Sequence, residues 1–112
     1  MVDSMQDYLK TLLAHIKISG KRYDTTKVKK AYELAFEAHK GQKRETGDEY
    51  ITHPVAVASI LTEMGMDTDC IIAALLHDVV EDTEKSLQDI EKQFGRDVAL
   101  LVDGVTKLNK IP

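Results

Sequence analysis

One histidine and three carboxylates follow the most apolar segment of the chain. The apolar run Cys70–Leu76 leads directly into His77-Asp78, and Glu81-Asp82 follow after two valines. Because residues four apart share a helix face, a helix through residue 82 places the Glu-Asp pair one turn beyond the His-Asp pair. Carboxylates gathered in this way repel one another unless water solvates them or a cation neutralises them. The pattern therefore indicates either a solvated acidic turn or a metal site.

A further histidine, His53, stands at the expected start of another helix, after a polar loop and before a proline. Adjacent helix residues point about 100° apart, so His77 and Asp78 share an ion only if it lies against the helix and another element adds a ligand. His53 is the candidate for that ligand. Mixed nitrogen and oxygen donors favour Mn²⁺, Fe²⁺ or Zn²⁺ over Ca²⁺ or Mg²⁺. From spacing alone, a solvated helix end remains the alternative, although acids at a helix C-terminus oppose the macrodipole.

The other histidines and the cysteine carry no comparable pattern. His15 and His39 have no acidic companions in the sequence, so we expect both to be structural or surface residues. Cys70 begins an apolar run and is expected to be a buried, inert thiol.

The composition indicates one ordinary globular domain. At 112 residues the chain sustains one hydrophobic core, and its 43% apolar and 30% charged residues fit a folded protein. A net charge of -4 predicts no general affinity for nucleic acid or anionic membranes. The longest apolar run is far shorter than the ~20 residues that span a bilayer. A single cysteine fits a reducing compartment, so we expect a soluble, cytoplasmic protein that binds neither nucleic acid nor membrane.

The apolar periodicity and the capping residues predict an all-α protein of about six helices, with no strand of useful length. The fourth helix is apolar on nearly every side and is expected at the centre of the fold. The expected helices run from Ser4 to near Gly20, from Asp24 or Thr25 to Gly41, from Thr52-His53-Pro54 to Gly65, from Asp67 into the His77-Asp78 cluster, from a capping box at Ser86-Asp89 to Phe94-Gly95, and through a last helix whose core face is Val98, Leu101, Val102, Val105 and Leu108.

Three blocks of the sequence resemble one family closely. They are "AHKGQKRETGDEYITHPVAVASIL" (38–61), "AALLHDVVEDT" (73–83) and "FGRDVALLVDGVTKL" (94–108). Together they look like the hydrolase domain of RelA/SpoT homologue proteins, which belong to the HD superfamily of metal-dependent phosphohydrolases and act on the alarmone (p)ppGpp. The resemblance covers essentially the whole chain, with residues 1–24 the least diagnostic. It implies that 1–112 is the N-terminal part of an HD helical bundle, truncated before its last helices.

The resemblance implies a reaction and the residues that perform it. The reaction is removal of pyrophosphate from the 3′ position of ppGpp or pppGpp, with one Mn²⁺ bound by His53, His77 and Asp78. Glu81 and Asp82 are implied to act on the attacking water, which favours a member that is competent in hydrolysis. In a bifunctional parent of the GTP pyrophosphokinase type, a (p)ppGpp synthetase domain is implied C-terminal to this one.

The loop over residues 40–46 is implied to hold the guanine nucleotide. Arg44 matches a position that stacks on the base, a role suited to a planar guanidinium. Lys40 and Lys43 are candidates for phosphate contacts, with simple solvation as the alternative. Glu45 stands where many members carry a second basic residue, and this departure bears on the binding of the base.

The family's fourth metal ligand has no counterpart among these residues. It is an aspartate in a later Asp-Arg-Leu-His-Asn type of block, and neither Asp97 nor Asp103 is its equivalent. We therefore expect weak Mn²⁺ binding by this chain, and inactivity of the isolated chain is one expected outcome. Two other functions remain open: an HD phosphohydrolase for another nucleotide, and a catalytically inert helical module that binds a nucleotide or a partner for regulation.

Overall fold

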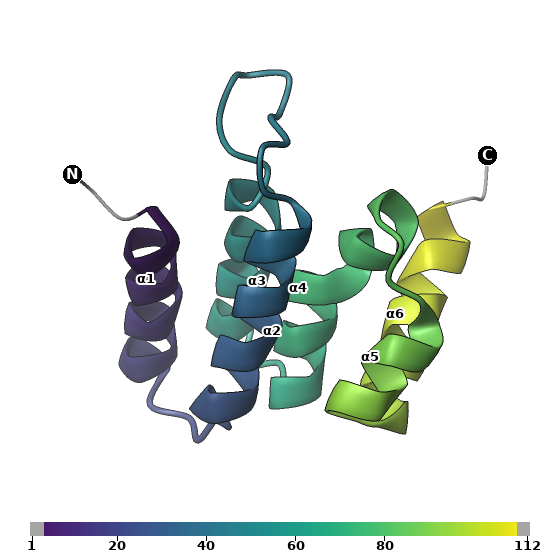
Figure 1. Ribbon diagram of the computed structural model, residues 1–112. Coiled ribbons are helices and arrows are strands. Elements are labelled where there is room, and N and C mark those ends of the chain that lie inside the picture. The colour runs from purple at the N-terminus through teal and green to yellow at the C-terminus, as the bar shows by residue number, and fades with distance from the viewer. Residues whose placement is uncertain (1–3, 110–112) are drawn as a thin grey trace.

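The computed structural model describes residues 4–109, which form six helices and no strand (Figure 1). The predicted all-α class is therefore confirmed. The helices are α1 (Ser4–Ser19), α2 (Thr25–Ala38), α3 (Thr52–Glu63), α4 (Thr68–Asp82), α5 (Leu87–Phe94) and α6 (Arg96–Asn109).

Side-chain caps fix the starts of three helices where the sequence predicts them. The carboxylates of Asp24 and Asp67 each accept a hydrogen bond from the backbone N–H three residues on, at 3.1 and 3.0 Å. Ser86 and Asp89 form the predicted capping box, in which each side chain accepts from the other residue's backbone N–H. Such caps pair N–H groups that the first turn of a helix leaves without partners.

The second helix ends at Ala38, a turn earlier than the predicted stop at Gly41. The backbone N–H of His39 still donates to the Ala35 carbonyl at 3.0 Å, but the chain then leaves the helix. Gly41 takes a φ of +84°, in the left-handed region that glycine enters at least cost. The prediction that residues 41–50 form a loop is confirmed.

That loop projects beyond the ends of α2 and α3 at the top of Figure 1. Its two limbs are joined by backbone hydrogen bonds from Tyr50 N–H to the Gln42 carbonyl at 3.0 Å and from Arg44 N–H to the Asp48 carbonyl at 2.8 Å. Gly47, with a φ of +93°, forms the turn between them. The base of the loop is thus tied at the point where it enters α3.

The fourth helix is the centre of the hydrophobic core, as predicted. Residues 71–76 are all buried, and α4 packs against α2, α3 and α6. Helix α1 covers α3 and α2 on one side, and α5 packs on α6 on the other. The polar end of α4 therefore leaves the core among the ends of its neighbours.

Two predictions for the last helix were wrong. Val98 and Val102 are fully buried, but Leu101 is 39% exposed and Leu108 is 66% exposed. Val98 and Val102 are four residues apart and share one buried face of α6, whereas Leu101 lies beside that face and Leu108 is near the end of the helix. Leu101 lines an apolar groove of about 260 Å³ between α3, α4 and α6.

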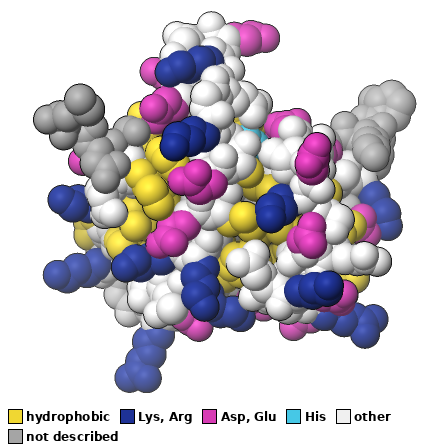
Figure 2. All heavy atoms as spheres, in the orientation of Figure 1, with side chains coloured by type: hydrophobic (Ala, Val, Ile, Leu, Met, Phe, Trp, Pro, Cys, Tyr) yellow, Lys and Arg dark blue, Asp and Glu magenta, His cyan; other side chains and the backbone are white. Residues whose placement is uncertain are grey.

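The surface is mixed in charge. Figure 2 shows Lys and Arg side chains interspersed with Asp and Glu over one face, with small apolar patches between them. None of the helices within residues 4–109 has the length and apolarity that crossing a membrane would need.

Candidate metal centre

Three predicted ligands converge where α3 begins and α4 approaches its end. His53 is in the first turn of α3, and His77 and Asp78 are in the last turns of α4. One ligand atom from each residue lies within 4.8 Å of the others. The His53 Nε2 is 3.9 Å from Asp78 Oδ2, and the His77 Nε2 is 3.2 Å from Asp78 Oδ1. The structure thus brings His53 next to a His-Asp pair that is more than twenty positions further along the chain.

The orientation of His77 is fixed by the backbone of its own helix. Its Nδ1 lies 2.8 Å from the Ala74 carbonyl oxygen, which only accepts, so Nδ1 carries a proton and donates. The Nε2 then faces the Asp78 carboxylate. A nitrogen lone pair so close to a carboxylate oxygen is unfavourable unless a proton or a metal ion lies between them. A histidine held through its other ring nitrogen is the usual arrangement of a metal ligand.

Asp78 is a buried carboxylate with a defined partner. It is 7% exposed, and the Tyr50 hydroxyl donates a hydrogen bond to its Oδ2 at 2.6 Å. A carboxylate removed from water needs such donors, or a cation, to remain charged. Burial and the hydrogen bond to Asp78 raise the pKa of Tyr50 well above its usual value. The hydroxyl therefore keeps its proton and remains a donor.

The two acids in the last turn of α4 lie outside the group of three formed by His53, His77 and Asp78. Glu81 and Asp82 are both exposed at the end of α4, where their carboxylates are open to water. Their negative charges also contribute to the raised pKa of Tyr50. Asp82 lines an open cleft of about 570 Å³ between the end of α2 and the start of α5. The arrangement thus puts carboxylates that can accept a proton next to, and not within, the group of three.

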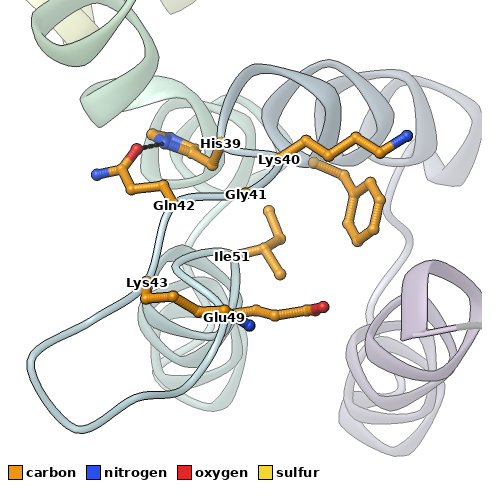
Figure 3. A pocket seen from close by; sticks show the side chains of 8 residues that line it. His39, Lys40, Gly41, Gln42, Lys43, Glu49 and Ile51 are labelled. Carbon is orange, nitrogen blue, oxygen red and sulfur yellow. Dashed lines mark hydrogen bonds between the residues drawn. The ribbon is translucent and has the colours of Figure 1, made fainter.

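The predicted nucleotide residues lie on the loop and apart from the group of three. Arg44, Lys43 and Glu45 are exposed. In the part of the chain that the structure describes, none of their side chains bonds to His53, His77 or Asp78. Lys43 lines a small cavity of about 90 Å³, which opens between the loop base and the end of α2 (Figure 3).

The sequence analysis missed Tyr50 and overestimated the burial of Cys70. Tyr50 lies in the loop three residues before His53, and its neighbours in the sequence give no signal for its contact with Asp78. Cys70 is half-buried at the apolar groove, which His77 also lines, and burial raises the pKa of its thiol. His39 is buried, while His15 is half-buried 3.9 Å from Glu63.

The fold is all-α, and the His77-Asp78 pair near the end of its central helix lies close to His53 at the start of α3. The model of the HD domain family matches residues 31–112. The chain therefore belongs to the HD domain family, and within it to the RelA/SpoT type.

Relatives of that type match nearly the whole chain. The bifunctional (p)ppGpp synthase/hydrolase SpoT of Escherichia coli K12 is 46% identical over 111 residues, which is 99% of this chain and 15% of SpoT. The GTP pyrophosphokinase of Streptomyces coelicolor is 49% identical over 106 residues, 92% of this chain and 12% of that protein. A guanosine-3′,5′-bis(diphosphate) 3′-pyrophosphohydrolase of Aquifex aeolicus is 47% identical over 108 residues, 96% of this chain and 15% of that protein. The chain thus spans less than a sixth of each of these relatives.

Proposed function

We propose that this chain is the (p)ppGpp 3′-pyrophosphohydrolase domain of a RelA/SpoT-type protein and that it uses one Mn²⁺. The observation that carries the proposal is the group formed by His53, His77 and Asp78, whose ligand atoms lie within 4.8 Å of one another. The names of the relatives indicate the substrate, because they include a (p)ppGpp synthase/hydrolase and a 3′-pyrophosphohydrolase.

The proposed donor set fits the ion. Two imidazole nitrogens and a carboxylate suit a divalent transition metal such as Mn²⁺, and His77 already presents Nε2 through its bond to the Ala74 carbonyl. When bound, the ion would neutralise phosphate charge and make a coordinated water more acidic.

In the proposed reaction, a water oxygen forms a bond to the phosphorus attached to the ribose 3′ oxygen. The bond between that phosphorus and the 3′ oxygen breaks, and pyrophosphate leaves, so that ppGpp becomes GDP and pppGpp becomes GTP. Glu81 or Asp82 orients the water and takes its proton, a task that suits exposed carboxylates one turn beyond the ligands. The proton that the departing 3′ oxygen needs comes from solvent or from that same acid.

The loop residues supply recognition in this proposal. Arg44 stacks on guanine, and Lys43 meets phosphate oxygens. Both side chains are exposed on a loop joined at its base, so they are free to adjust to a nucleotide. A synthetase domain elsewhere in the parent protein is part of the same proposal, since one relative is named a bifunctional synthase/hydrolase.

The direct experiment measures pyrophosphate released from ppGpp by this chain, with Mn²⁺ and with a chelator. We expect Mn²⁺-dependent release that falls at least about 100-fold in Glu81→Gln or Asp82→Asn, the usual range for a lost general base. Glu84→Gln is the matched control, because Glu84 is an exposed acid just beyond the helix end and should retain activity. Equal loss in all three variants would contradict the assigned roles.

Substrate class is tested separately at the loop. Arg44→Ala should weaken binding of guanine nucleotides and leave Mn²⁺ binding unchanged, whereas Arg22→Ala, at an exposed arginine between α1 and α2, should change neither. Equal affinity for adenine and guanine nucleotides in the unaltered chain would favour an HD phosphohydrolase for another substrate. Stoichiometric Mn²⁺ binding without hydrolysis of any nucleotide would favour the regulatory module.

A further inference from the structure

Tyr50 connects the base of the loop to the candidate metal centre. Its hydroxyl donates to Asp78 Oδ2 at 2.6 Å, across 28 positions of sequence. Its ring lies against His39 with centroids 4.6 Å apart, and it meets the His53 ring edge-on at 5.9 Å. Tyr50 therefore contacts one proposed ligand through its hydroxyl and a second through its ring, while a buried histidine supports it from behind.

His39 and Gln42 hold this tyrosine in place. His39 is only 3% exposed, and its Nδ1 is 3.0 Å from the Gln42 side-chain oxygen, which only accepts, so Nδ1 donates. The Gln42 backbone bonds to both His39 and Tyr50. Its N–H donates to the His39 carbonyl at 2.9 Å, and its carbonyl accepts from Tyr50 N–H at 3.0 Å. Figure 3 shows the bond between the two side chains at the edge of the small cavity. The three residues form a closed set of contacts.

We propose that Tyr50 is a positioning residue for the metal centre, which holds Asp78 in one rotamer and is itself held by His39 and Gln42. The inference rests on the proposed metal site. Asp78 has a single side-chain donor among the described hydrogen bonds, Tyr50, and an aspartate side chain exchanges between rotamers about its χ1 and χ2 bonds unless packing or a partner fixes it. A fixed carboxylate loses less conformational entropy when it meets an ion. Loss of such an outer partner typically weakens metal binding about 10–100-fold.

A hydrogen bond that only stabilises the fold is the competing explanation, and the chain offers a matched control for it. The Tyr23 hydroxyl donates to the Met66 carbonyl, also at 2.6 Å, and links the start of α2 to the turn before α4. Tyr23→Phe and Tyr50→Phe thus remove the same chemical group from hydrogen bonds of the same length. Only the second bond ends on a proposed ligand.

The first measurement is the Mn²⁺ affinity of the full chain. Electron paramagnetic resonance detects the free ion and so gives the bound fraction in each titration. Tyr50→Phe should weaken binding about 10–100-fold, and Tyr23→Phe should stay within about twofold of the unaltered chain. His39→Phe keeps a ring against Tyr50 and should stay close to the unaltered chain, whereas His39→Ala should weaken binding. Unchanged affinity in Tyr50→Phe, or an equal loss in Tyr23→Phe, would overturn the proposal.

The second measurement needs no metal. Nuclear magnetic resonance couplings of Asp78 report whether its side chain keeps one rotamer, and they should show one rotamer in the unaltered chain and averaging in Tyr50→Phe. Circular dichroism checks that Tyr50→Phe and Tyr23→Phe both fold. If the unaltered chain binds no Mn²⁺, the proposed metal site is wrong. The comparison of Asp78 rotamers between the unaltered chain and Tyr50→Phe then still tests the role of Tyr50. A single Asp78 rotamer that persists in Tyr50→Phe would refute the positioning role.

Discussion

Replacing Asp78 by asparagine should abolish metal-linked stabilisation while leaving the metal-free fold nearly as stable. The amide oxygen of asparagine still accepts from the Tyr50 hydroxyl, so the buried hydrogen bond remains, although it loses its charge assistance. A hydrogen bond to a charged group contributes about 1.5–3 kcal/mol and a neutral one about 0.5–1.5 kcal/mol, so this change costs roughly 1 kcal/mol. The cost of burying a carboxylate, 7% exposed in the structure, disappears at the same time and offsets that loss.

The metal adds a much larger difference. An ion that binds only the folded chain stabilises it by about 2.7 kcal/mol at a hundred times its dissociation constant. For a domain of this size, that energy raises the unfolding midpoint by roughly 10–20 °C. Asp78→Asn removes the only anionic ligand of the proposed site, so the same Mn²⁺ concentration should leave its midpoint almost unchanged.

Thermal unfolding is monitored by circular dichroism, with Mn²⁺ and with a chelator. It measures the stability of the metal-free fold and the shift of the unfolding midpoint that Mn²⁺ causes. Asp97→Asn is the control, because Asp97 is an exposed acid at the start of α6 and should keep the full Mn²⁺-induced shift. The reasoning would be refuted if Asp78→Asn kept the shift, which would place the ion elsewhere. A metal-free loss above about 3 kcal/mol would show instead that the charge of Asp78 supports the fold.

Two further predictions concern ion affinity and acid stability. Three protein ligands leave the remaining coordination positions to water, so calorimetric titration should give a Mn²⁺ dissociation constant well above micromolar; a micromolar or tighter value would contradict this. The backbone and side-chain hydrogen bonds of Ser86 lower the pKa of Asp89. A folded-state pKa below the unfolded one contributes stability above the unfolded value, near 3.9, and that contribution is lost as the pH falls through the folded value. Urea unfolding between neutral and acidic pH should therefore show a smaller acid-side loss in Asp89→Asn, and an unchanged pH profile would rule out this role for the capping box.

Local sequence determined the helices and most of their ends. The caps at Asp24, Asp67 and Ser86 bond to backbone groups three residues away, so the sequence alone carries the information they need. The unbroken apolar character of residues 71–76 likewise predicted a buried central helix, because a helix that is apolar all round must be covered. The neighbouring positions of His77 and Asp78 on one helix were fixed in the same way.

Only the tertiary structure decided what those helix ends meet. Spacing left open whether His53 and the His-Asp pair converge, since their separation depends on how α3 packs against α4. The bond from Tyr50 to Asp78 and the exposure of Leu101 follow from that same packing and leave no local pattern. Hydrogen bonds within a turn depend on neighbours in the chain, whereas contacts between helices depend on the shapes of whole surfaces, which a short sequence window does not contain.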